Sequence, residues 1–245
     1  MLEHFSIFVI GLLAGFFDSV VGAGGLISTP ALLLLGLSPQ TAIATDRFGS
    51  LGQSIAAFFS FNKAKKINWN YVWIFSLLSL AGSLIGARIL LHVDTDILQR
   101  IVAILILALL PLIIFGKKKE TTMPKPTARR VALGLFSYFV IMTFGGFFGQ
   151  GTGPLMFYAL SYFLGFTLVE ILATGIIPWL VLSASSTFVF AINGIIDYQK
   201  GLVLFVGMAV GGYLGAHLAV TKGDGWLKRL FIIFVVVASI KLLFF

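Results

Sequence analysis

The chain has 245 residues, of which 59% are hydrophobic and only 11% are charged. Soluble domains usually carry about 25% charged residues, and a mean hydropathy of +1.05 indicates apolar surface that faces lipid. Cysteine is absent from the sequence, which excludes disulfides, thiolate metal sites and thiol catalysis. The net charge is +8, but the basic residues lie in short loops and form no soluble basic module, so no nucleic-acid partner is expected.

Apolar segments follow one another along the chain and predict an all-α polytopic membrane protein. The first half carries them at 4–21, 26–36, 41–61, 69–92 and 97–115. After a polar, basic stretch, the second half carries them at 131–149, 153–165, 168–192, 201–220 and 226–245. These runs are continuously apolar, which argues against the alternating strands of a β-barrel. We expect a first transmembrane repeat (1–115), a basic cytoplasmic linker (116–130) and a second transmembrane repeat (131–245).

The two halves match each other in sequence at one constant offset, which we call the repeat offset. The register holds without a gap from Gly22 through Arg100 in the first half. The matched pairs include Gly22 with Gly151, Gly24 with Gly153, Thr45 with Thr174, Ser54 with Ser183, Gly82 with Gly211, Gly86 with Gly215 and Arg100 with Arg229. Because internal repeats are common in transporters, we predict a duplicated fold with two five-segment repeats.

The basic loops predict the orientation of the chain, since cytoplasmic loops carry an excess of lysine and arginine. One such loop lies at 63–66, and the linker at 116–130 carries six more basic residues. An odd number of crossings in each half turns the second repeat upside down, and this places the basic residues at 222–229 in the cytoplasm as well. The charge bias therefore favours inverted repeats.

A glycine-rich loop precedes one short segment in each half. Residues 15–25 read GFFDSVVGAGG, and residues 146–153 read GFFGQGTG. The segment 26–36 spans only about 17 Å as a helix, whereas the hydrocarbon core is about 30 Å thick. We therefore expect short broken or re-entrant helices. Irregular backbone at that depth is tolerated only where it lines a cavity or is buried in protein.

The start of a short helix is suited to an anion, because its amides are unpaired and lie at the positive end of the helix dipole. We therefore predict a small anionic substrate bound at both loops. The predicted ligands are Gly22, Gly24, Gly25, Gln150, Gly151, Thr152 and Gly153. Small residues also allow close helix packing, which is the interpretation that we favour for the glycine pairs at 82/86 and 211/215.

Arg47 follows Thr45 and Asp46 near the start of the third segment. Ionisable residues within membrane segments are rare and usually functional, and a guanidinium is suited to oxyanions. We predict that Arg47 binds the substrate together with Thr45 and its counterpart Thr174. Two alternatives remain open, an ion pair of Arg47 with Asp46 or Asp18, and a guanidinium that reaches a membrane interface.

Acidic residues in or near the spans are candidates for carrying a coupling proton, namely Asp18, Asp46 and Glu170. The alternative for Glu170 is a helix end in water. An aspartyl protease would need Asp18 and Asp46 close together, and the residues around them do not match such proteases. The three histidines show no metal-ligand spacing, and nothing resembles a Walker loop, so neither a metal nor a cofactor is expected.

The stretch GFFDSVVGAGGLISTPALLLLGLSPQTAIATDRFGS at 15–50 resembles the first signature of the sulfite exporter TauE/SafE family, and is closest to its YfcA-like branch. The segments GFFGQGTGPLMFYAL, GSLIGAR, GGYLGAH and TKGDGWLKRLFIIFVVVASIKLL are similar to the same branch, so the resemblance covers nearly the whole chain. It implies a duplicated helical transporter that exports or takes up sulfite, sulfonates or related small organic anions.

The resemblance also extends to single positions. A basic residue commonly follows an Ala-Thr-Asn motif in that branch, and Arg47 matches it while Asp46 replaces the asparagine. The equivalent region of the second half, 175–178, carries no cation, so the two halves are less symmetric than the family pattern.

These features together predict a non-enzymatic secondary transporter in the bacterial inner membrane, which moves a small anion by alternating access. A passive anion channel is the alternative. The expected partners are the lipid bilayer, the anion and a coupling proton. The oligomeric state stays open, with a homodimer among the options.

Overall fold

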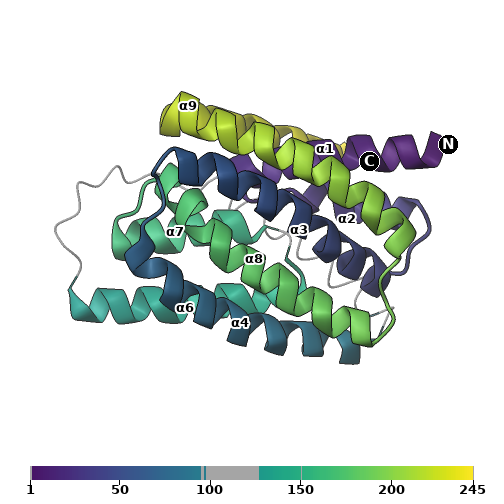
Figure 1. The fold of residues 1–245 in the computed structure, drawn as a ribbon, viewed down its shortest axis with the longest axis horizontal. Helices are drawn as coiled ribbons and strands as arrows, with labels where there is room; N and C mark the ends of the chain where they lie inside the picture. The colour runs from purple at the N-terminus through teal and green to yellow at the C-terminus, as the bar shows by residue number, and fades with distance from the viewer. Residues whose placement is uncertain (1, 95–96, 98–126, 150, 245) are drawn as a thin grey trace.

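The computed structural model describes residues 2–94, 97, 127–149 and 151–244 (Figure 1). The helices assigned within these ranges are α1 (Leu2–Val21), α2 (Gly25–Leu34), α3 (Pro39–Lys63), α4 (Trp69–His92), α6 (Ala128–Phe147), α7 (Thr152–Leu164), α8 (Leu168–Ile192) and α9 (Tyr198–Phe244). Non-helical backbone at Gly223 divides α9 in two. The predicted all-α class is confirmed for the described residues. The predicted fifth segment and most of the linker lie outside them.

Local sequence signals set several helix boundaries. Ser38 caps α3 by accepting a hydrogen bond from the amide of Thr41, and Pro39 occupies the first helical position. Thr167 and Glu170 form a capping box at the start of α8. Glu170 therefore lies at a helix end, as the alternative to proton carriage predicted.

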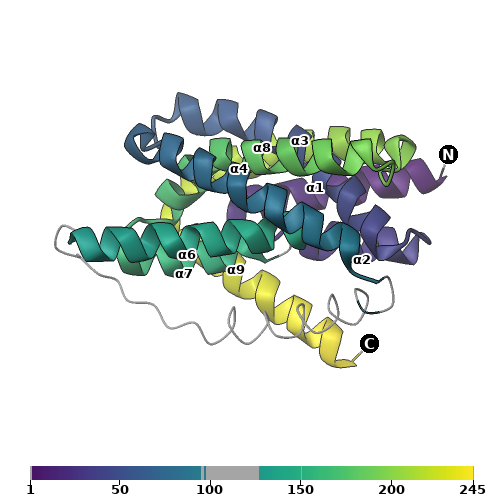
Figure 2. The same cartoon turned by 90° about the horizontal axis from the view of Figure 1, so that it is seen from below.

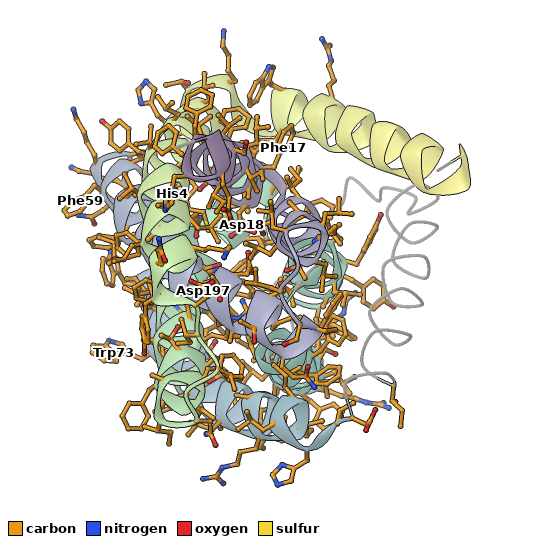
Figure 3. All side chains as sticks on the ribbon, turned by 90° about the vertical axis from the view of Figure 1, so that its right-hand side faces the viewer. His4, Phe17, Asp18, Phe59, Trp73 and Asp197 are labelled. Carbon is orange, nitrogen blue, oxygen red and sulfur yellow. The ribbon has the colours of Figure 1, made fainter. Side chains whose placement is uncertain are left out.

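The described helices include five that are long and apolar enough to cross a membrane, namely α1, α4, α6, α8 and the Tyr198–Gly223 part of α9. Their outward faces carry large apolar side chains. Figure 3 shows Phe59 and Trp73 pointing away from the bundle, and Trp73 is 77% exposed. Apolar surface of this extent fits lipid better than water, so the fold is that of a multi-pass membrane protein.

Charged side chains divide the bundle into a basic end and an acidic end. The basic end holds the α3–α4 loop, with its lysines at 63–66, and the start of α6, where Val131 packs in one cluster with Tyr71. At the acidic end, Lys200 lies 3.1 Å from Asp197 and 3.5 Å from Glu3. Partial desolvation raises the pKa of Asp197, but hydrogen bonds from Lys200 outweigh this effect and hold the pKa below its ordinary value. The positive-inside rule predicts that the basic end is cytoplasmic.

Helices α3 and α8 lie side by side and run in opposite directions. The amide of Asn68, after α3, donates to the hydroxyl of Thr174 near the start of α8 at 3.0 Å. The amide of Asp197, after α8, donates to the hydroxyl of Thr45 near the start of α3 at 3.1 Å. The two bonds join residues that are equivalent at the repeat offset. Inverted repeats predict this antiparallel arrangement. The duplication itself stays a prediction.

The first helix of each half packs against the fourth helix of the other half. Helix α1 packs on α9, where a Cβ at Gly211 would lie 2.0 Å from the carbonyl oxygen of Leu12. Helix α6 packs on α4, where a Cβ at Gly86 would lie 2.1 Å from the carbonyl oxygen of Thr143. These glycines therefore serve close helix packing, as predicted.

Two helical hairpins enter the bundle from opposite ends. Helix α1 begins, and α2 ends, at the acidic end, whereas α6 begins, and α7 ends, at the basic end (Figures 1 and 2). Helices α2 and α7 have only 10 and 13 residues, so neither is long enough to cross the bilayer alone. The predicted short helices are thus present, and the turns of both hairpins lie inside the protein.

Candidate functional site

The glycine turns of the two hairpins contact each other directly. The amide of Gly153 donates a hydrogen bond to the carbonyl oxygen of Gly22 at 3.0 Å. A Cβ on Gly153 would lie 2.4 Å from the Cα of Gly22, so there is no room for a side chain at this contact. Gly22 has φ +66°, in the left-handed region that glycine adopts most readily. The structure therefore brings together loops that belong to opposite halves of the sequence.

The predicted glycine ligands fall at this junction. Gly22, Gly24 and Gly25 form the turn of the first hairpin, and Gly151, Thr152 and Gly153 form that of the second. Gln150 lies outside the described residues.

A cavity of about 60 Å³ lies beside the junction. Because one water needs about 10–15 Å³, this volume suits roughly four waters, or one anion of four heavy atoms. Helix α8 contributes Gly175 and Trp179 to its wall. The junction contributes Gly22 and Gly153, and the polar side chains on the wall are those of Asp18, Ser19, Gln53 and Thr152. Figure 3, seen from the acidic end, shows Asp18 among the helices.

The amides at the starts of the short helices are already paired. The amide of Gly24 donates to the carboxylate of Asp18 at 3.0 Å, so an acidic side chain occupies the positive end of α2. The amide of Gly153 is taken by Gly22. The expectation of unpaired amides facing an anion therefore fails for Gly24 and Gly153 in this conformation. An anion that used them would have to displace Asp18 or separate the two turns.

Arg47 is buried inside the bundle and is only 1% exposed. Its Nη2 donates to the carbonyl oxygen of Gly145 at 2.6 Å, and its guanidinium lies 5.2 Å from the ring centroid of Trp179. In the part of the chain that the structure describes, the ion pairs within 4.0 Å join Lys200 to acidic residues and do not include Arg47. Arg47 thus neither reaches a membrane interface nor forms a structural ion pair there.

The guanidinium of Arg47 lies against the second glycine turn. A Cβ at Gly149 would lie 1.5 Å from Nη2 of Arg47, so any larger residue would clash with the guanidinium. Gly149 also has φ +85°, in the left-handed region that favours glycine. The Nε atom has no hydrogen-bond partner among the described residues, and a buried unpaired donor costs about 1–3 kcal/mol. Arg47 is not part of the cavity wall. Trp179 contacts both the cavity and the cation, and so connects them.

Asp18 and Asp46 place two carboxylates near this cation. Asp46 accepts a hydrogen bond from the hydroxyl of Ser28 on α2, whereas Asp18 accepts one from Gly24. Both carboxylates interact electrostatically with Arg47. The three groups carry a net charge of −1 when both acids are ionised, so a single bound proton neutralises the set.

Two of the predicted ligands lie away from the cavity. Thr45 and Thr174 sit towards opposite ends of the bundle, and each hydroxyl accepts a backbone amide from a loop. In this conformation they hold loops. Sequence reasoning missed Ser19 and Trp179, since a serine or tryptophan inside an apolar segment carries no signal of its own. The side-chain amide of Gln53 donates to Ser19 at 2.8 Å, which joins two polar groups of a wall that is otherwise largely apolar.

Gly153→Ala should lower the midpoint of thermal unfolding of the purified protein. The new Cβ would lie within 2.5 Å of backbone atoms of Gly22 and Val21, which cannot turn aside as a side chain can, and such overpacking costs about 1–3 kcal/mol. Gly225→Ala is the matched control, because this glycine is helical and no heavy atom of the described residues lies within 4 Å of an added Cβ there. Equal midpoints for the two variants would contradict direct contact between the turns.

The sequence is similar to known membrane proteins along almost its whole length. It is 28% identical over 238 residues to the "Probable membrane transporter protein" of Haemophilus influenzae, which covers 97% of this chain and 93% of the relative. It is 30% identical over 244 residues to the "Probable membrane transporter protein YfcA" of Escherichia coli K12, which covers 97% and 88%. A Bacillus subtilis relative, the "Probable membrane transporter protein YunE", is 26% identical over 235 residues, with 86% of each chain covered.

No solved structure matches the chain. The family profile described as "Sulfite exporter TauE/SafE" matches residues 7–242. This match covers the helices that build both hairpins and the cavity between them. The chain therefore belongs to the sulfite exporter TauE/SafE family of membrane transporters.

Proposed function

We propose that this chain is a secondary transporter that moves a small anion, such as sulfite, a sulfonate or a related organic anion, across the bacterial inner membrane. One observation carries the proposal. Two hairpins from opposite ends meet at Gly22 and Gly153, beside a cavity whose largely apolar wall also carries Asp18, Ser19, Gln53 and Thr152. Half-helices that meet inside the bilayer form the substrate sites of many transporters. The family description supports the choice of anion.

The cavity wall offers neutral hydrogen-bond donors to such an anion. Gln53 uses one amide hydrogen on Ser19 and keeps the other for a ligand. The indole Nε1 of Trp179 has no hydrogen-bond partner within the described ranges. Arg47 supplies positive charge from behind Trp179, where the low dielectric of the interior makes it effective over several ångströms. The anion is thus held by neutral donors and attracted by a nearby fixed cation.

Apolar clusters lie on both sides of the junction and support alternating access. Towards the basic end, Phe61 packs with Ile67 and Val169. Towards the acidic end, Phe148 packs with Leu90 and Phe190. In the proposed cycle the two clusters separate in turn, while the hairpins stay anchored to opposite halves of the protein. A channel would instead need both clusters open at once.

Asp18 couples the anion to a proton in this scheme. Its carboxylate lines the cavity and holds the amide of Gly24, so in ionised form it repels an entering anion. A proton on Asp18 removes this repulsion and frees the start of α2, where the helix dipole favours the anion. Proton and anion therefore enter the cavity together.

We expect proteoliposomes that contain the protein to accumulate radiolabelled sulfite above its external concentration when the external solution is more acidic than the lumen. Asp18→Asn should exchange sulfite but lose this accumulation, because the amide carries no proton across. Glu170→Gln is the matched control, since Glu170 caps α8 at an exposed helix end and should keep the accumulation. A wild-type protein that only equilibrates sulfite would indicate a channel, and accumulation by Asp18→Asn would remove Asp18 from coupling.

A further inference from the structure

One face of α8 continues from the cavity towards the acidic end. Gly175 and Trp179 line the cavity from this face. At 3.6 residues per turn, the positions that follow on the same side are Ser183, Ser186 and Thr187. With a rise of about 1.5 Å per residue, they extend roughly 12 Å beyond Trp179. We call these three residues the hydroxyl track.

The hydroxyls of the track have no hydrogen-bond partner in the part of the chain that the structure describes. Ser183 and Ser186 are both 0% exposed. A helical serine usually bonds to a carbonyl of the preceding turn, and the neighbouring Ser185 does so, to Val181 at 2.7 Å. All three hydroxyls of the track thus lack the usual bond to a helix carbonyl, and all three lie on one face of α8. Because buried polar groups are nearly always paired, these hydroxyls call for water or a polar ligand.

The rest of α8 sets the direction of this polar face. On the side away from the track, Ala184 is exposed and Phe188 is 64% exposed, as expected for a surface against lipid. Towards the basic end, the cavity side of α8 carries Leu172 and Ile176, which are apolar. On the cavity side of α8, polar groups thus lead from the cavity towards the acidic end and not towards the basic end.

We propose that the hydroxyl track lines the path of the anion between the cavity and the acidic, external end. The inference rests on the proposed function and deepens it, since it identifies the external half of the path. Neutral hydroxyl groups suit this role, because they replace part of the hydration shell of an anion without holding it as tightly as a cation would. Arg47 lies beside the cavity, behind Trp179, where the anion is proposed to bind.

Cysteine labelling tests the proposal directly, because the natural sequence contains no cysteine. Ser183→Cys, Ser186→Cys and Thr187→Cys are each treated from the external side with a membrane-impermeant, negatively charged methanethiosulfonate. Ser185→Cys is the matched control, since this position packs towards Ser83 of α4. Thiols need water to ionise and react, so we expect the track positions to be modified about tenfold faster than the control. Mass spectrometry reads the modified fraction, and labelling after denaturation gives the total thiol.

The labelling result is independent of any transport assay. Track positions that react no faster than position 185 overturn the inference, and if the protein still accumulates sulfite the proposed function stands. Fast labelling of the track in a protein that fails to accumulate sulfite supports a hydrated path and removes the proposed function. Nearly isosteric serine-to-cysteine exchange keeps the fold, which the unfolding midpoint of each variant checks.

Discussion

Arg47→Ala is expected to reduce sulfite uptake by about thirtyfold or more, which corresponds to the loss of roughly 2 kcal/mol for removing one member of a buried charged group. Arg47 is only 1% exposed, and its guanidinium places a positive charge near the cavity. The carboxylate of Asp18 lies in the wall of the same cavity. Without the guanidinium, a bound anion meets uncompensated negative charge. The apolar spans are unchanged, so the variant should still insert in the membrane. Uptake into proteoliposomes, normalised to the amount of inserted protein, measures the effect.

Two further variants make this result specific to the guanidinium. Arg88→Ala is the matched control, because Arg88 also lies on a membrane-spanning helix but is exposed, and it should keep wild-type uptake. Arg47→Lys keeps the charge but loses the planar fork that bonds Gly145 and stacks on Trp179, so an intermediate rate is expected. Wild-type uptake by Arg47→Ala would remove this residue from the site.

Gly175→Val is expected to abolish uptake while the protein still folds. Gly175 lines the cavity from α8, and among the described residues the only heavy atom within 4 Å of an added Cβ is the flexible methyl end of Met156, at 3.2 Å. A small shift of the Met156 methyl therefore accommodates the Cβ, and we expect the valine methyl groups to occupy space in the cavity that the anion needs. Valine is also a better helix former than glycine. Unfolding midpoints and uptake are measured on the same preparations.

Gly225→Val is the matched control for this substitution, since an added Cβ there meets no heavy atom of the described chain within 4 Å. It should retain both the unfolding midpoint and the uptake of the wild type. Loss of uptake in both variants would point to a general effect of adding bulk to a helix.

The sequence predicted the general form of the site, because its signals are local and repeated. Short apolar segments after glycine-rich loops predicted short broken or re-entrant helices, and the structure confirms that α2 and α7 are short helices. An arginine inside a span predicted a buried cation, and Arg47 is buried. Both predictions follow from the high cost of irregular backbone and of charge in lipid, which leaves few alternatives to a buried site.

The partners of each group could not be predicted, because they depend on packing between distant segments. The carboxylate of Asp18 accepts a hydrogen bond from the amide of Gly24, whereas the sequence suggested that this amide was unpaired. Trp179 stacks on Arg47 from the other half of the chain, a contact that only the packing of α3 against α8 decides. The sequence predicted that Thr45 binds the substrate, yet its hydroxyl accepts a hydrogen bond from the backbone amide of Asp197 in a loop. A polar residue in a span indicates that a partner is needed and does not say which one.

The charged groups of the site belong to one half of the chain. At the repeat offset, the counterparts of Asp18, Asp46 and Arg47 are Phe147, Gly175 and Ile176. Two hairpins of similar shape thus surround a cavity whose charges come from the first half alone. The two halves share glycine-rich loops but not charged residues, which explains why the repeat pattern located the turns but not the titratable groups.

Equilibrium binding of radiolabelled sulfite to the purified protein tests most directly whether the anion occupies the cavity at the hairpin junction. The wild type and Gly225→Val should bind it saturably, whereas Gly175→Val, with the same unfolding midpoint, should show no saturable binding, because its valine fills the roughly 60 Å³ space. Equal affinity of sulfite for Gly175→Val and the wild type would place the anion elsewhere and contradict this account.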